Sequence, residues 1–320
     1  MTAPAPRARV IGAGVIGLTT AMALRADGWD VDVITAEAPA DTTSSVAAAF
    51  WYPYLVGPAD AVERWGLTSA EQLATMARVD GLPVQARTVH ELFRTADVDP
   101  GWRTQMQDDQ RITGPLPDGV LDGWRYTSWV ADMPLYLGWL TEQCALEDVP
   151  IEVRRIESLS AAYAPGIDLL VNCAGVGSQQ LADDATVVPV AGQVIIVRAP
   201  EVTDIWLDAD TPGGSTYVVP RTDTVVLGGT AGRGVWDRTP DPAATDEILA
   251  RCTELVPSLA GAEVLDVQVG LRPARPEVRL ELDGIAECLV LHHYGHGGAG
   301  LTLSWGSALE AVQMARNVKM

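Results

Sequence analysis

Cysteine is scarce in this sequence, and the few cysteines lie far apart. The chain has 320 residues and only 4 cysteines, none of them in a Cys-x-x-Cys pair. Neither a zinc cage nor a disulfide framework is therefore indicated, and we interpret the thiols as reduced core residues of a cytoplasmic protein. The sequence leaves a bridge between Cys252 and Cys288 open as an alternative.

Basic residues and long apolar runs are also lacking. Lys and Arg together number 22 against 42 for Asp and Glu, which gives a formal net charge of −20. Such a charge repels nucleic acid and anionic lipid, so we expect neither as a partner. No segment provides the ~20 apolar residues of a membrane span. A metal is not expected either, because His292 and His296 have no third ligand at a suitable spacing.

One apolar run near the N-terminus needs an explanation. Residues 10–24 follow Arg7 and Arg9, and Ala21-Met22-Ala23 imitates a signal-peptidase site. The run nevertheless contains glycines at fixed offsets, and a strand-like alternation resumes after Gly28. We therefore expect this segment to be the start of the fold rather than a cleaved signal.

The glycines of this run form a dinucleotide-binding pattern. A short β-branched strand, residues 9–11, precedes Gly12-Ala13-Gly14-Val15-Ile16-Gly17 and a helical stretch. Gly12 permits the tight turn, Gly14 lets backbone N–H groups approach a pyrophosphate, and Gly17 lets the helix pack closely on the sheet. The helix N-terminus adds partial positive charge. The alternative is an ordinary strand-to-helix turn.

A second strand and an acidic residue complete the pattern. Residues 30–35 alternate polar and apolar side chains, and Glu37 follows Gly17 by twenty residues. An acid at this distance usually accepts hydrogen bonds from a ribose diol. These residues do not distinguish between dinucleotides, so an NAD-linked enzyme remains open at this point.

Residues 42–54 favour a flavin. Four consecutive hydroxyl residues, 42–45, can donate hydrogen bonds to phosphate oxygens, and the alanines at 47–49 let backbone pass close to a flat ring system. Phe50, Trp51, Tyr52 and Tyr54 then supply aromatic walls. The alternative is a Ser/Thr-rich loop that leads into core aromatics.

Several further motifs together resemble the D-amino acid oxidase family, nearly end to end. The narrowest are GLRPARPEVRLE at 270–281 and YGHGGAGLTLSWG at 294–306. The others are residues 10–18, 42–54, 126–128 with a helix at 135–144, IDLLVNCAG at 167–175, Gly192-Gln193, and YVVPRTDTVVLGG at 217–229.

The resemblance implies an α/β fold that pairs a Rossmann-type FAD-binding domain with an α+β substrate domain on a mostly antiparallel sheet. Two domains also suit the length, since single cores stop growing at about 250–300 residues. We expect the FAD-binding domain at 1–50, 135–185 and 262–320, and the substrate-binding domain at 51–134 and 186–261. Within the latter, residues 56–134 indicate helix and loop.

The same resemblance assigns catalytic roles to three residues. Arg272 lies among apolar neighbours and needs an anion, so it would clamp the substrate α-carboxylate, with Glu277 as the alternative partner. Tyr217 would bind the same carboxylate, although alone a strand tyrosine indicates core packing. The Gly298 carbonyl would accept from the substrate amine.

The family also implies the pocket and the cofactor contacts. The substrate pocket would comprise Phe50, Tyr52, Tyr217, Arg272 and Gly298. The FAD-binding residues would be Gly12, Gly14, Val15, Ile16, Gly17, Glu37, Thr43, Ser44, Ser45, Ala48, Ala49, Ile156, Cys173, Gly175, Gly297, Gly298, Gly300, Leu301 and Thr302.

The implied reaction is oxidative deamination of a D-amino acid to a 2-oxo acid, ammonia and hydrogen peroxide, by hydride transfer to flavin N5 with oxygen as acceptor. Alternatives are D-aspartate oxidase, for which Arg221 or Arg233 would supply a second cation, glycine or sarcosine oxidase, and a flavin dehydrogenase with a protein acceptor. A homodimer is a further possibility. The sequence departs from the vertebrate enzymes around Glu37 and at 212–214, where no tyrosine-bearing lid is present.

Overall fold

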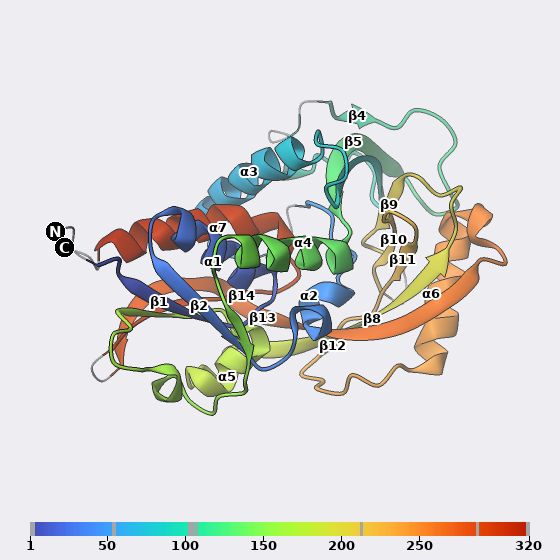
Figure 1. The fold of residues 1–320 in the computed structure, drawn as a ribbon. Helices are drawn as coiled ribbons and strands as arrows, with labels where there is room; N and C mark the ends of the chain where they lie inside the picture. The colour runs from blue at the N-terminus through green and yellow to red at the C-terminus, as the bar shows by residue number, and fades with distance from the viewer. Residues whose placement is uncertain are drawn as a thin grey trace.

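One large sheet organises the molecule. The computed structural model describes residues 4–52, 56–101, 106, 108–211, 214–285 and 288–317. Among these residues, fourteen strands form a single sheet with the order β4-β5-β3-β9-β10-β11-β8-β13-β14-β7-β1-β2-β6, and β12 pairs with β8 beside this path. Helices cover the sheet on both sides (Figure 1). The expected α/β class is confirmed.

One half of the sheet is parallel. Its central strand pairs in parallel with neighbours on both sides, so that Val10 lies between Val33 and Val171. Its inner strands β1 and β7 are mostly buried because both faces of a parallel sheet are covered. The strands of this half are β1 (Arg7–Ile11), β2 (Asp30–Thr35), β6 (Ile151–Val153), β7 (Leu169–Asn172) and β14 (Cys288–His296).

Helices sandwich the parallel half. Figure 1 shows α1, α4 and α7 together on one side of these strands and α5 on the other. Helix α3 crosses α7 so closely that a Cβ on Gly306 would lie 2.2 Å from the carbonyl oxygen of Trp65. The helices of this half are α1 (Val15–Ala26), α2 (Thr43–Val46), α3 (Ala59–Met76), α4 (Met133–Leu146), α5 (Ser178–Leu181) and α7 (Gly300–Arg316).

The other half of the sheet is mostly antiparallel. Helix α6 (Pro242–Leu255) packs on one face, where Ile248 and Cys252 contact Ile195 and Val218. The opposite face is covered by Ala48, Phe50 and Tyr52. The strands are β3 (Val84–Phe93), β4 (Gln110–Arg111), β5 (Asp122–Ala131), β8 (Val188–Arg198), β9 (Ile205–Asp208), β10 (Thr216–Pro220), β11 (Val225–Gly228) and β12 (Gly232–Arg233).

The expectation of helix and loop across residues 56–134 is wrong for the stretches that form strands β3, β4 and β5. After α3, strands β3 and β5 pair along their whole length, from Val84 opposite Ala131 to Phe93 opposite Asp122. The hydrophobic alternation of β3 is hidden because a charged residue, Glu91, occupies one of its buried positions. A pattern search for alternating apolar residues therefore misses this strand.

Strand β13 (Glu263–Ile285) joins the two halves. Its first part pairs with β8 as far as Ala274, and its second part pairs with β14 from Arg279 onward, with a register shift between them. Figure 1 shows this strand, in orange, running along the molecule. The expected domain boundary at 262 thus falls at the start of a strand that serves both halves, and the division into domains remains a prediction.

A buried carboxylate holds the shifted part of β13. Asp184 accepts hydrogen bonds from Arg275 Nε at 3.0 Å and from the Tyr294 hydroxyl at 2.9 Å. Burial alone would raise the pKa of Asp184, but hydrogen bonds from Thr186, Tyr294 and Arg275 outweigh it and lower the pKa to about 2. Arg275 is therefore a scaffold residue.

The cysteines are consistent with a reduced core. Cys144, Cys173 and Cys252 are buried and free. The alternative bridge between Cys252 and Cys288 is therefore wrong, because Cys252 is unbridged and its thiol faces the Tyr217 carbonyl at 3.6 Å. Separately, no helix in the described part of the chain has the length and apolar character needed to cross a membrane.

Replacing Asp184 with Asn should destabilise the fold by roughly 2 kcal/mol at pH 7. The reason is that the fold lowers the pKa of Asp184 to about 2, and the stabilisation of the charged carboxylate that this reflects is lost in the variant. Since the folded-state pKa is depressed, this contribution is present above about pH 4 and is lost as the pH falls toward about 2. Thermal unfolding of both proteins from pH 7 to pH 3 measures it. A stability difference that stays constant with pH would contradict the charge-based account.

Candidate functional site

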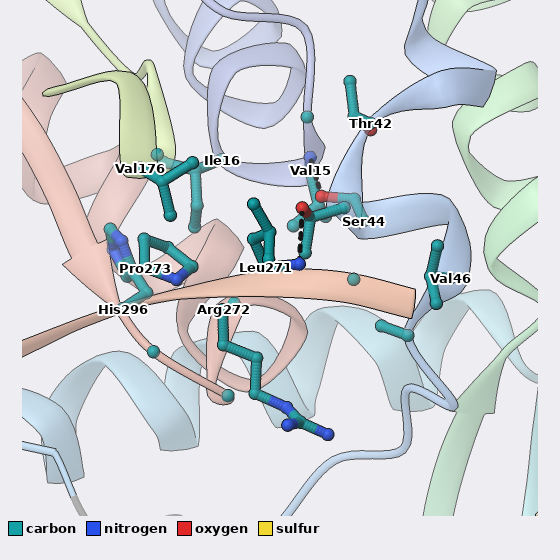
Figure 2. A pocket seen from close by; sticks show the side chains of 18 of the residues that line it. Val15, Ile16, Thr42, Ser44, Val46, Val176, Leu271, Arg272, Pro273 and His296 are labelled. Carbon is teal, nitrogen blue, oxygen red and sulfur yellow. Dashed lines mark hydrogen bonds between the residues drawn. The ribbon is translucent and has the colours of Figure 1, made fainter. Parts of the chain in front are cut away.

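A single cavity collects the motifs that the sequence analysis singled out. Its volume is about 1070 Å³, and it extends from the β1–α1 turn to the antiparallel half of the sheet. Its walls come from the β1–α1 turn, the end of β2, residues 42–52, β10, β13 and the β14–α7 turn. Figure 2 shows residues from the start of α1, from residues 42–46, from β13 and from the end of β14 facing the same space.

The glycine turn has the geometry of a dinucleotide cradle. Gly12 adopts a φ of +107°, and a Cβ there would lie 2.5 Å from the Cys173 carbonyl oxygen. A Cβ on Gly17 would lie 1.9 Å from the Gly12 oxygen, so Gly17 serves close packing and does not line the cavity. The first turn of α1 leaves the N–H groups of Ile16 and Gly17 without acceptors within the helix, as an anion site requires.

The hydroxyl segment lies where expected, but its residues differ in role. Thr43 Oγ1 accepts from Leu271 N at 3.2 Å, and Ser44 Oγ accepts from Val15 N at 3.0 Å (Figure 2). Each hydroxyl acts there as an acceptor, so each keeps a proton that it can donate to a phosphate. Ser45 instead donates to Thr42 O and does not line the cavity. Its place among the cofactor contacts remains a prediction.

The far end of the cavity holds Glu37 together with residues that the sequence did not indicate. Glu37 lines the wall as predicted, and its Oε1 lies 3.1 Å from Arg238 Nη1. Arg154 and Arg155 line the same end, next to the expected Ile156. Nothing in the sequence could locate these arginines, because they come from segments far from the glycine motif and match no motif of their own.

Arg272 and Tyr217 meet at the opposite end. Arg272 Nη1 donates to Thr230 O at 3.0 Å, and Nη2 lies 3.5 Å from the Tyr217 hydroxyl. Arg272 makes no ion pair with any acid among the described residues, so the alternative pairing with Glu277 is not realised. A half-buried guanidinium without a carboxylate is suited to an external anion.

Two glycines make room for this pair. A Cβ on Gly192 would lie 2.1 Å from Arg272 Nη1, and one on Gly228 would lie 2.0 Å from the Tyr217 ring. In Figure 2, Arg272 leaves β13 on the side opposite Leu271, while Leu271 faces the glycine cradle. Neighbouring residues of one strand point to opposite faces, so β13 presents one residue to each part of the cavity.

The β14–α7 turn supplies the third side of the site. Gly297 has a φ of +55° and donates to Pro273 O at 3.0 Å, which ties the turn to β13. Gly298 follows with an accessible backbone and lines the cavity. The Thr302 hydroxyl donates to Tyr52 O at 2.9 Å and so joins the start of α7 to the aromatic wall.

The histidines beside the cavity are uncharged at neutral pH. Burial lowers the pKa of His296 to about 3, and burial followed by the proximity of His296 lowers the pKa of His293 well below its usual value. No group of three potential metal ligands occurs in the described parts of the chain. Neither histidine therefore competes with Arg272 for an anion.

The two arginines considered for an acidic substrate lie outside the cavity lining. The Arg221 guanidinium is buried and donates to Ala47 O at 2.7 Å, and Arg233 is exposed on β12. Tyr54, Pro212 and Gly213, which the sequence analysis also named, lie outside the described residues. Every other predicted site residue, apart from Gly17 and Ser45, lines the cavity.

Comparison with known proteins gives a consistent result. Residues 7–314 match a family model described as FAD dependent oxidoreductase. The D-amino-acid oxidase of Rubrobacter xylanophilus is 44% identical over 97% of this chain and 95% of its own length. The human D-aspartate oxidase is 37% identical over 96% of this chain and 94% of its own length.

Solved structures show the same fold at low identity. A glycine oxidase from Bacillus cereus superposes with a TM-score of 0.79, at 19% identity, over 98% of this chain and 95% of its own. An L-proline dehydrogenase from P. horikoshii gives a TM-score of 0.76 at 14% identity, over 98% and 94%. These structures share the architecture, although one is named a glycine oxidase and the other an L-proline dehydrogenase.

Replacing Gly14 with Val should abolish flavin retention, because the branched side chain would occupy the path of the pyrophosphate. Its Cβ alone would lie 3.0 Å from Ser44 Oγ. The absorbance spectrum of the purified variant measures this loss, with Gly138→Ala as control because a Cβ at Gly138 meets nothing within 4 Å. A fully yellow Gly14→Val protein would refute the cradle assignment.

Proposed function

Because the chain belongs to the FAD-dependent oxidoreductase family that it matches across residues 7–314, we propose that it oxidises D-amino acids to 2-oxo acids, ammonia and hydrogen peroxide. The observation that carries this proposal is the Arg272–Tyr217 pair, which faces the same cavity as the glycine cradle without a protein carboxylate among the described residues. Relatives 35–44% identical carry the name D-amino-acid oxidase.

The residues that line the cavity have the chemistry that FAD requires. The turn at Gly12 and Gly14 and the hydroxyls of Thr43 and Ser44 would hold the pyrophosphate, and Glu37 would bind the adenosine ribose. The remaining contacts come from residues 47–49 and the β14–α7 turn, where the N-terminus of α7 favours negative charge. When bound, FAD accepts a hydride and then passes electrons to oxygen.

The protein residues orient the substrate. Arg272 and Tyr217 bind the α-carboxylate, and the Gly298 carbonyl accepts a hydrogen bond from the neutral amine. With both groups held and the flavin ring fixed, only one enantiomer would direct its Cα–H at the ring, and the names of the relatives support the D enantiomer. Holding reactants in such a geometry can contribute about 7–11 kcal/mol toward lowering the barrier. No side chain need act as an acid or base.

Oxygen as acceptor and a cytoplasmic location complete the proposal. The buried free thiols Cys144, Cys173 and Cys252 suit a reducing compartment, in which disulfides do not persist. A homodimer remains an expectation from the sequence.

Replacing Arg272 with Ala should raise KM for D-amino acids by roughly 10- to 100-fold or more, because charge-assisted hydrogen bonds of about 1.5–3 kcal/mol are lost. The flavin content should not change. Steady-state peroxide production measures the effect, and Arg233→Ala, which removes an exposed arginine outside the cavity, serves as the matched control. Unchanged kinetics in Arg272→Ala would remove Arg272 from the site.

The choice of acceptor and of enantiomer can be tested on the unaltered enzyme. Anaerobic addition of neutral D-amino acids should bleach the flavin spectrum, and admission of air should restore it rapidly with formation of peroxide. L-Enantiomers should leave the spectrum unchanged. Slow reoxidation in air would favour a dehydrogenase with a protein acceptor, and activity on glycine or sarcosine alone would replace the proposed substrate class.

A further inference from the structure

Residues 230–241 run along the cavity from its Arg272 end to its Glu37 end, and we call them the crossing segment. At its start, Thr230 O accepts a hydrogen bond from Arg272 Nη1 at 3.0 Å. Further along, Arg238 lines the same cavity, and its Nη1 lies 3.1 Å from Glu37 Oε1. One stretch of chain therefore contacts both the residue that clamps the substrate and the residue expected to bind the ribose of FAD.

Strand β8 anchors the crossing segment on both sides of Arg238. Gly234 N donates to Pro189 O at 2.8 Å. Asp241 N donates to Gln193 Oε1 at 2.7 Å, and Gln193 Nε2 donates to Asp241 O at 2.9 Å. The Gln193 side chain is buried, so this second anchor belongs to the core of the sheet. The sheet thus fixes the place from which the Arg238 side chain starts.

The Arg238 guanidinium bridges to the connection between β2 and α2. Besides its approach to Glu37, Arg238 donates through Nη2 to Asp41 O at 3.3 Å. A planar fork can engage two acceptors at once, which a lysine ammonium does with less geometric specificity. Since Arg238 and Glu37 both line the cavity, this bridge forms part of the cavity wall at the Glu37 end.

A contribution to folding does not account for this bridge. The Arg238 and Glu37 side chains are 40% and 41% exposed, and ion pairs as exposed as this stabilise a fold little. Their arrangement does suit a ribose. Arg238 engages Oε1 of Glu37, and no hydrogen bond from the described residues reaches Oε2, which is left to accept from a ribose diol. Arg238 also keeps N–H donors for ribose oxygens, because it uses two of its five.

We propose that Arg238 is a cofactor-binding residue that holds the adenosine ribose of FAD together with Glu37 and slows release of the cofactor. This inference rests on the proposed function only through its FAD site, and not on the choice of substrate. The crossing segment is tied to β8 on both sides of Arg238, so it cannot swing aside without breaking these bonds. Departure of the adenosine part therefore requires that the hydrogen bonds of Arg238 itself be broken.

The first test measures FAD affinity after Arg238→Gln. The holoenzyme is diluted stepwise, and free flavin is separated by ultrafiltration to give Kd. We expect Kd for FAD to rise by about tenfold, the lower end of the effect of a hydrogen bond to a charged group. Arg198→Gln is the matched control, because Arg198 forms an exposed ion pair with Glu263 at 3.0 Å and does not line the cavity. The control should keep the Kd of the unaltered protein.

The second test repeats the measurement with FMN, which has the flavin ring and one phosphate but no adenosine. Arg238→Gln should leave Kd for FMN unchanged, so that the ratio of Kd for FMN to Kd for FAD falls by about tenfold. A residue that merely holds the crossing segment in place would weaken the binding of both flavins alike. Equal weakening of FMN and FAD therefore overturns the inference.

The outcomes separate this inference from the proposed function. If Arg238→Gln binds FAD as tightly as the unaltered protein, Arg238 belongs to a surface ion pair only and the inference is overturned. All readouts are flavin affinities, so they do not depend on turnover. An unaltered protein that retains FAD but oxidises no D-amino acid would refute the proposed function alone.

Discussion

The site depends on a guanidinium that no acid of the described chain neutralises. A half-buried charge is costly unless it is paired, and Arg272 has only a carbonyl and a tyrosine hydroxyl as partners. The surrounding structure maintains this state: Gly192 leaves space for the side chain, and the pairing of β13 with β8 fixes its origin. The fold thereby holds Arg272 in position to bind a carboxylate.

Strand β13 connects Arg272 with the glycine turn at Gly12 and Gly14. The Leu271 N–H donates a hydrogen bond to Thr43 Oγ1, while the Arg272 side chain points to the other end of the cavity. Downstream, Asp184 and Tyr294 hold the shifted part of β13, and Gly297 is bound to Pro273. Cofactor-facing and substrate-facing groups thus share one rigid backbone, which suits a reaction that needs accurate alignment of two molecules.

The sequence predicts the backbone-determined parts of the site well. The glycines at 12 and 14 lie where the motif requires, and Gly17 has the predicted packing role although it does not line the cavity. Arg272 could be singled out because a lone charge among apolar neighbours must have a partner. Residues 42–45 all carry hydroxyl groups, so the pattern could not separate their roles. Ser45 donates its hydroxyl hydrogen bond to Thr42 O.

The parts that the sequence could not predict depend on pairing between distant segments. Strands β3 and β5 are held by full-length pairing, which a local pattern with a buried glutamate does not reveal. Arg238 reaches Glu37 across 201 positions of the chain. Glu91 is an ordinary charged residue in the sequence, and only the fold shows that it is buried and accepts a hydrogen bond from the Tyr52 hydroxyl.

The continuity of β13 limits how substrate can enter the cavity and how product can leave it. Many two-domain proteins admit ligands by a hinge motion that opens a cleft between the domains. Here the hydrogen-bonded ladder runs from one half into the other along a strand of 23 residues, so a hinge between the halves would have to rupture the sheet. Exchange of product for fresh substrate therefore has to take place at the rim of the cavity, with the two halves held together by one sheet.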